Sequence, residues 1–260
     1  MPHSWKTISD NLTPKRNLIY EKIFKHRVQH LPINWTNQSG MCIGSRGPIR
    51  RSQSPNDQVN CCTARDIYTM NLVYIHGANA TSESFNYIRS KLGNGVDINY
   101  DSRNGFENNL KDMQSTLQDH KDLVFVAHSL GGIYSLHLAN LMPMAVKGAV
   151  TLSTPYGGAE VADYAQYFLP FSRLMRDIGP SSWVMKQARN IKIQHPWTNI
   201  VTVKGQSPFM HEPNDGVVTI ASQRHHDDME LVEVDYNHYE VVLSDQVVEL
   251  IKERVKKFRK

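Results

Sequence analysis

The chain has 260 residues, 40% hydrophobic and 21% charged, which is enough apolar material for one large α/β domain or two small ones. No segment approaches the ~18 consecutive apolar residues of a transmembrane helix, and the first residues lack the apolar core of a secretory signal. The formal charge of +4 is uneven, because residues 1–70 hold 10 Lys and Arg against 4 Asp and Glu. No basic stripe interleaved with aromatic residues accompanies this excess, so nucleic-acid binding is not predicted.

Cysteine usage favours a reducing compartment. Cys42, Cys61 and Cys62 cannot all pair, and the last two are neighbours, so we expect no disulfide framework and a cytoplasmic location. The spacings CxxC and HExxH are missing, and we therefore predict neither a metal site nor a cofactor. The sequence does not indicate an oligomeric state.

The composition changes at about Met70. Residues 1–69 are basic and rich in Ser, Gly, Asn and Pro, which predicts a largely irregular N-terminal extension. Only residues 17–31 carry an apolar pattern of helical period. Two interpretations remain open: this helix is an arm that binds a partner, or the extension adds little to a functional unit that begins near Met70.

From Met70 onward, strand and helix patterns alternate. Short apolar runs predict strands at 71–77, 96–101, 122–129, 146–155, 199–205 and 229–236. Amphipathic or capped segments predict helices at 82–92, 105–119, 130–142 and 240–258. This alternation predicts a mostly parallel central sheet with helices on both faces. Active sites in such sheets lie beyond the carboxyl ends of the strands.

The stretch "VFVAHSLGGIY" places Ser129 between a predicted strand and a predicted helix. A serine exposed at such a sharp elbow needs small residues two positions away on each side, here Ala127 and Gly131. The pattern also occurs around serines in purely structural turns. Its position after a buried strand, with further parts following in order, favours a nucleophile.

A serine nucleophile needs a base and an acid that orients the base, and with this elbow they follow in the order acid, histidine. Asp215 lies in the turn "NDG" after a predicted strand, and His238 lies between the last predicted strand and the last helix. Asp215 fits the acid and His238 the base, although a turn aspartate and a surface histidine are the structural alternatives. His211 and the pair His225-His226 precede the last strand and fit less well.

Two backbone amides are expected to complete the site. One belongs to Leu130, directly after the serine, and the other to Ala78 in the loop after the first strand. His76 is expected to support this loop structurally. His128, beside the serine in sequence, is expected to point away from the site.

Residues 70–260 resemble an α/β-hydrolase of the lipase and serine-esterase type. The segments "VYIHGAN", "VAHSLGG", "LSTPYGG", "NDGVV" and "NH" occur in the order found in that family, and "LSTPYGG" is similar to a segment of bacterial lipases and of lipid-anchor deacylases. The resemblance implies an α/β-hydrolase fold with Ser129, His238 and Asp215 as catalytic triad and the amides of Ala78 and Leu130 as oxyanion hole. Ala127 replaces the usual glycine, and Tyr156 stands where histidine is common.

A long insertion at about 156–197 resembles the short helical cap of such enzymes. It is rich in large apolar side chains, which suit the gripping of an acyl chain, although some of them must pack in the core. The expected substrate-binding residues are Tyr156, Phe168, Phe171 and Trp183.

The sequence therefore predicts a serine hydrolase that cleaves carboxylic esters of lipids or other hydrophobic acyl compounds through an acyl-enzyme intermediate. A thioesterase or acyltransferase would use the same triad and remains open. The alternative from another class is a catalytically silent, hydrolase-like binding scaffold. We expect a small-molecule or lipid ester as partner, and the absence of a membrane span still permits transient contact with a membrane surface.

Overall fold

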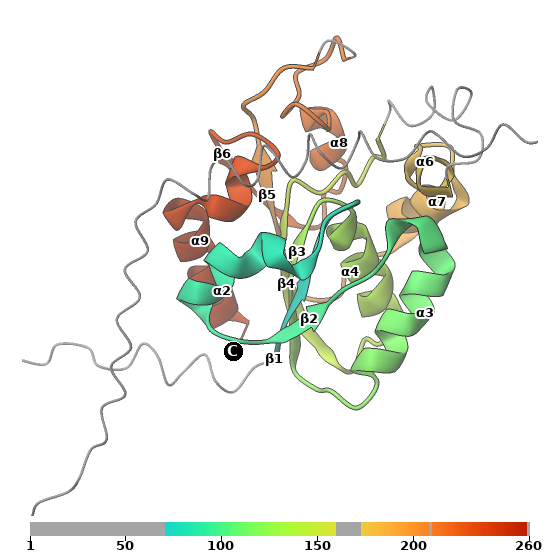
Figure 1. Ribbon diagram of the computed structural model, residues 1–260, viewed down its shortest axis with the longest axis vertical. Coiled ribbons are helices and arrows are strands. Elements are labelled where there is room, and N and C mark those ends of the chain that lie inside the picture. The colour runs from blue at the N-terminus through green and yellow to red at the C-terminus, as the bar shows by residue number, and fades with distance from the viewer. Residues whose placement is uncertain (1–70, 160–172, 208–209, 259–260) are drawn as a thin grey trace, which may run out of the picture. The chain divides into compact units, whose positions relative to one another are not determined.

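The computed structural model describes residues 71–159, 173–207 and 210–258 (Figure 1). The predicted helix at 17–31 and the rest of the N-terminal extension lie outside the described residues. The described part contains a six-stranded sheet in the order β2-β1-β3-β4-β5-β6, and every neighbouring pair is parallel. The strands are β1 (Asn71–Ile75), β2 (Val96–Ile98), β3 (Leu123–His128), β4 (Val146–Leu152), β5 (Trp197–Thr202) and β6 (Glu230–Val234).

Helices connect the strands. The α-helices are α2 (Asn86–Leu92), α3 (Phe106–Leu117), α4 (Leu130–Leu141), α6 (Arg173–Ile178), α7 (Trp183–Asn190), α8 (Ile220–Gln223) and α9 (Asp245–Lys257). Short 3-10 turns are η2 (Ser82–Phe85), η3 (Ser102–Asn104) and η4 (Glu240–Leu243). Among the described helices, none combines the length and the apolar character needed to cross a bilayer.

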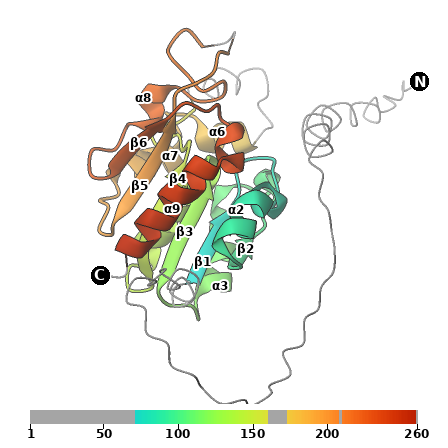
Figure 2. The same ribbon diagram turned by 90° about the vertical axis from the view of Figure 1, so that its left-hand side faces the viewer.

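Two hydrophobic layers hold helices on the two faces of the sheet. Alternate residues of each strand point to opposite faces, so Val124 and Val126 of β3 enter one layer while Phe125 enters the other. Helices α2 and α9 cover the first face, and α3, α4 and α7 cover the second (Figures 1 and 2). Both faces of β3 are therefore completely buried, which explains its unbroken apolar sequence.

The last predicted helix begins later than its pattern indicated. Residues 240–243 form the turn η4, and α9 starts only after Ser244, whose Oγ accepts a hydrogen bond of 3.3 Å from the Val247 amide. A serine at this position favours a helix start because its side chain satisfies an amide that has no partner within the helix. The break separates the loop that carries His238 from the long surface helix.

Candidate active site

Three side chains from separate loops meet beyond the carboxyl ends of the strands. Ser129 directly follows β3, Asp215 lies between β5 and α8, and His238 follows β6. The His238 ring places Nε2 3.0 Å from Ser129 Oγ and Nδ1 2.8 Å from Asp215 Oδ2. The three residues that the sequence indicated thus form one hydrogen-bonded line.

The direction of the protons along this line follows from the donors available. A carboxylate only accepts, so His238 Nδ1 carries the hydrogen that binds Asp215. His238 Nε2 is then an acceptor, and it faces the hydroxyl of Ser129. The His238 amide also donates to the Asp215 carbonyl at 3.1 Å, which ties the two loops together at the backbone. The ring is therefore in the tautomer that can take a proton from serine.

Ser129 occupies a strained backbone position. Its φ of 54° and ψ of −123° lie outside the regions that non-glycine residues normally adopt, at a cost on the order of 1–3 kcal/mol. Two backbone hydrogen bonds hold it there: the Ser129 amide donates to Leu152 at 2.8 Å, and its carbonyl accepts from Gly132 at 2.9 Å. The chain thus passes from β3 to α4 within one residue and leaves the serine half-exposed at the turn.

Two glycines allow α4 to start this close to the sheet. A Cβ atom on Gly131 would lie 2.2 Å from the Ile75 carbonyl oxygen, and one on Gly132 would lie 2.0 Å from Thr154 Oγ1. Neither distance is sterically allowed. Ala127, in contrast, is inside β3 and fully buried, and its methyl group packs in the apolar layer beneath α4. The elbow therefore tolerates alanine where glycine is usual.

Asp215 is buried and held in its ionised form. Its Oδ1 accepts from the amides of Val217 at 3.0 Å and Val218 at 2.8 Å, and its Oδ2 accepts from Thr202 Oγ1 at 2.6 Å. Burial alone would raise the pKa of this carboxyl, but the hydrogen bonds from His238, Thr202 and Val218 outweigh it and lower the pKa. Asp215 is thus a fixed negative charge behind the imidazole.

His128 supports the site, which corrects the expectation that it points away. Its Nε2 donates to the His238 carbonyl at 2.8 Å, and the two rings lie 4.8 Å apart. Burial, and then the neighbouring His238 ring, lower the pKa of His128 to about 3. His128 is therefore neutral near neutral pH and acts as a donor that holds the backbone of His238.

The loop after β1 approaches the serine closely. A Cβ atom on Gly77 would lie 3.1 Å from the Cβ of Ser129, so a larger residue would press on the nucleophile. Ala78 comes next, and Leu130 is the first residue of α4. Within the described residues, neither the Ala78 nor the Leu130 amide has a hydrogen-bond acceptor. Both N–H groups thus remain available to a ligand, as the proposed oxyanion hole requires.

His76 supports this loop from below, as expected. It is fully buried, its Nδ1 donates to the Gly77 carbonyl at 2.8 Å, and its Nε2 accepts from the Tyr100 amide at 3.3 Å. The Tyr100 ring stacks on the imidazole at 4.3 Å. Both ring nitrogens are engaged, and burial lowers the pKa of His76, so it serves as a neutral structural residue.

Tyr156 does not fit the role expected of it. The side chain is fully buried, and its hydroxyl lies 2.9 Å from Thr151 Oγ1 while accepting from Trp197 Nε1 at 2.8 Å. These bonds place the ring in the core beside β4 and β5 rather than on an exposed surface. Sequence alone could not separate this position from a pocket residue, because a tyrosine suits both a satisfied core and a binding surface.

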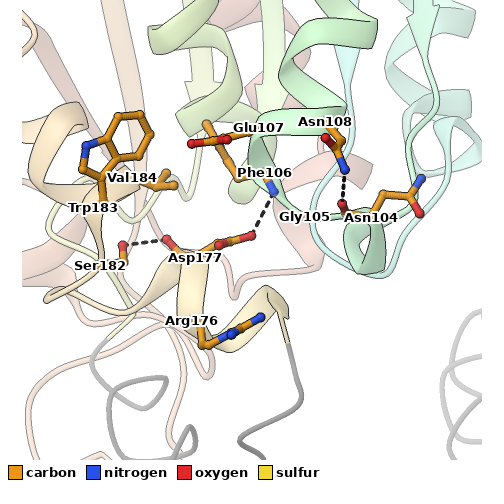
Figure 3. A pocket seen from close by; sticks show the side chains of 10 residues that line it. All are labelled: Asn104, Gly105, Phe106, Glu107, Asn108, Arg176, Asp177, Ser182, Trp183 and Val184. Carbon is orange, nitrogen blue, oxygen red and sulfur yellow. Dashed lines mark hydrogen bonds between the residues drawn. The ribbon is translucent and has the colours of Figure 1, made fainter.

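Trp183 lies on an open pocket of about 450 Å³ between α3 and the α6–α7 pair (Figure 3). The indole is 57% exposed and shares the pocket wall with Phe106. Asp177 joins the two sides, because its Oδ2 accepts from the Phe106 amide at 2.8 Å at the start of α3. The other two expected substrate-binding residues, Phe168 and Phe171, lie outside the described residues.

A second histidine–aspartate pair, in which only the histidine is buried, lacks a serine. His226 Nδ1 lies 3.1 Å from Asp228 Oδ1, but its Nε2 faces the carbonyl of Ala188 at 3.2 Å. This pair joins α7 to the loop before β6. Within the part of the chain that the structure describes, no group of three or more His, Cys, Asp or Glu side chains could hold a metal ion.

Residues 72–233 match the model of the alpha/beta hydrolase family. The chain belongs to this family. The match covers the elbow and Asp215, and the fold class expected from the sequence is confirmed. No curated protein has a sequence similar enough to this chain to count as a match.

Similar solved structures include lipases. The mature form of lipase BlEst2 from Bacillus licheniformis has a TM-score of 0.55 and 15% identity over 72% of this chain and 91% of that one. Phospholipase PlaB from Legionella pneumophila has a TM-score of 0.58 and 11% identity over 73% and 61%. A monoacylglycerol lipase from Paleococcus ferrophilus has a TM-score of 0.50 and 14% identity over 72% and 93%. At these identities the likeness establishes the shared fold alone.

The elbow geometry predicts that Gly131→Ala destabilises the protein. The new methyl group has only backbone around it, so the start of α4 must move away from β1. We expect the free energy of unfolding in urea to fall by roughly 1–3 kcal/mol. Asn140→Ala, at an exposed site of the same helix, is the control and should not destabilise. Equal stability of the Gly131 variant and the wild type would contradict this account of the elbow.

The neutral state of His128 predicts a pH-dependent stability. Because its pKa is lowered on folding, its contribution is fully present above the unfolded pKa of about 6.5 and is lost as the pH falls toward 3. Between pH 7 and pH 5 this single group should cost about 2 kcal/mol. Urea unfolding at both pH values should therefore show a smaller loss for His128→Gln than for the wild type. Identical losses would mean that His128 is charged or exposed in the folded protein.

Proposed function

We propose that this protein is a serine hydrolase that cleaves carboxylic esters of lipids or other hydrophobic acyl compounds. The observation that carries the proposal is the unbroken hydrogen-bonded line Ser129–His238–Asp215 at a strained elbow. The turn at Ser129 leaves its side chain partly exposed, as a nucleophile requires. Membership of the alpha/beta hydrolase family supports the same assignment.

The acylation step follows from the orientation of the groups. His238 Nε2 takes the proton of the Ser129 hydroxyl as the oxygen attacks the ester carbonyl carbon. The imidazolium that forms is stabilised by the negative charge of Asp215. Collapse of the tetrahedral intermediate breaks the ester C–O bond, and His238 returns the proton to the leaving alcohol. The product is an acyl ester on Ser129.

Deacylation repeats these steps with water as the nucleophile. His238 removes a proton from a water molecule, the hydroxide attacks the acyl carbonyl, and the proton returns to Ser129 as the acid departs. We assign stabilisation of both oxyanions to the amides of Ala78 and Leu130, and loss of one such donor typically costs about a hundred-fold or more in rate. Serine, histidine, aspartate and water supply every proton and electron pair, so the proposed reaction needs no cofactor.

The hydrophobic substrate class rests on the pocket beside α3 and α7. Trp183 presents an exposed indole there, and Phe106 and Val184 line the same wall (Figure 3). Phe168 and Phe171 remain proposed contributors from the insertion between β4 and β5. An exposed indole on a concave surface favours an acyl chain over a small polar acid.

The triad assignment predicts large losses in kcat toward a p-nitrophenyl ester. Asp215→Asn should lower kcat by about 10⁴-fold, because the amide selects the wrong tautomer of His238, and His238→Ala should cost at least as much. The matched controls are Asp228→Asn and His226→Ala, which disrupt the other histidine–aspartate pair. Circular dichroism checks that all four variants fold. Near-full activity of either triad variant would contradict the assignment.

The pocket predicts a selective effect of Trp183→Ala. Because the indole would cover part of the acyl chain, KM for an eight-carbon ester should rise by about five-fold while KM for an acetate ester stays within error. Met144→Ala is the control, since Met144 is 95% exposed outside the pocket. Equal changes for both chain lengths would place the acyl chain elsewhere.

A further inference from the structure

The buried side chain of Gln223 contacts the acid of the site. It is the last residue of α8 and is fully buried. Its Oε1 accepts from the Thr202 amide at 2.9 Å, and its Nε2 donates to the Thr202 carbonyl at 3.2 Å. The last residue of β4 to pair with β5 is Leu152, opposite Ile200. The Gln223 amide therefore takes the place of a neighbouring strand at the end of β5, where β4 has stopped.

The orientation of this amide is determined by its partners. The Thr202 N–H can only donate, so it must face Oε1, and the nitrogen of Gln223 lies on the other side. One N–H of Nε2 binds the Thr202 carbonyl, and the second donates to Asp215 Oδ2 at 3.0 Å. Flipping the amide would place the acceptor Oε1 against two other acceptors, Asp215 Oδ2 and the Thr202 carbonyl, and the donor Nε2 against the donating Thr202 amide. The nitrogen is thus held toward the carboxylate.

The helix that carries Gln223 is fixed at both ends. The Thr219 side chain caps its start by accepting from the Ser222 amide at 3.2 Å. At its end, Asn199 Nδ2 donates to the Gln223 carbonyl at 2.8 Å from within β5. Asn199 in turn accepts from Thr151 Oγ1 at 2.9 Å. A buried network thus locates the Gln223 side chain, so its contact with Asp215 does not depend on a flexible rotamer.

We propose that Gln223 is a positioning residue for the catalytic acid. Asp215 Oδ2 accepts from His238, Thr202 and Gln223, and Oδ1 accepts from two backbone amides. Rotation of the carboxylate would break several of these bonds at once. The hydrogen bond from Gln223 holds Asp215 Oδ2 in the orientation that accepts from His238 Nδ1. It also keeps the carboxylate in its ionised form, which can only accept. The inference rests on the proposed function, because it assigns a role within the same triad.

The first variant removes the donor while keeping the length of the side chain. Gln223→Met should lower kcat for a p-nitrophenyl ester by about 10- to 100-fold, the range expected for loss of one hydrogen bond to a charged group, with KM little changed. Circular dichroism and the urea midpoint check the fold. A variant that folds and turns over ester at the wild-type rate overturns the proposal.

The second variant restores the donor only when it is protonated. In Gln223→Glu two carboxyl groups share the site, so they retain one proton at a raised pKa. Below that pKa the protonated glutamic acid donates to Asp215 as glutamine does, and above it two negative charges face each other. The ratio of variant to wild-type kcat should therefore be highest at low pH and fall by ten-fold or more as the pH rises. A ratio that is the same at every pH indicates packing alone and overturns the proposal.

Asn109→Asp provides the matched control, since it makes the same amide-to-acid exchange at another buried site. Asn109 Nδ2 binds the Asp101 carbonyl and Tyr134 Oη rather than the triad. The ratio of kcat of Asn109→Asp to wild-type kcat should not fall as the pH rises. Failure of the proposed function itself looks different: the wild type would not turn over esters at all. A different result would reject only the role of Gln223. In that case the wild type is active and Ser129→Ala is inactive, but the ratio of Gln223→Glu to wild-type kcat is the same at every pH.

Discussion

The hydrogen bond between His238 Nδ1 and Asp215 Oδ2 is the interaction on which the candidate site depends. It joins the loop after β6 to the loop after β5, and it selects the one tautomer of His238 whose Nε2 can accept from Ser129. Neighbouring groups hold both partners of this hydrogen bond in place. Thr202 and two backbone amides hold the carboxylate, and His128 holds the backbone of the histidine. Without this bond, Ser129 would still occupy a strained elbow but would have no base oriented to activate it.

The parallel sheet makes this convergence feasible for residues far apart in the chain. The carboxyl ends of β3, β5 and β6 lie at one edge, so the loops that follow them start close together. Strain at Ser129 is tolerated because Gly131 and Gly132 let α4 approach β1 and Thr154, and because β3 is buried on both faces. The rigid core thus provides the stability that offsets the strained turn.

The sequence predicted the strands, the elbow and the three residues of the line, because each depends on local pattern or on order along the chain. It did not predict the side chains around Asp215. Thr202 falls within a predicted strand and Gln223 in no predicted element, and the roles of both depend on β4 ending before β5 and leaving a backbone edge to fill. The predictions for Tyr156 and His128 fail for a related reason, because the direction of a side chain at or beyond the end of a strand depends on tertiary contacts that no periodicity records.

The central claim is that Ser129 is an activated nucleophile. Incubation of the full chain with a fluorophosphonate probe, followed by mass spectrometry of the digested protein, tests it most directly. The account predicts one covalent adduct, located on Ser129, that forms in the wild type and is lost in Ser129→Ala. A well-folded wild type that acquires no adduct, or one that is labelled equally after the substitution, would contradict it.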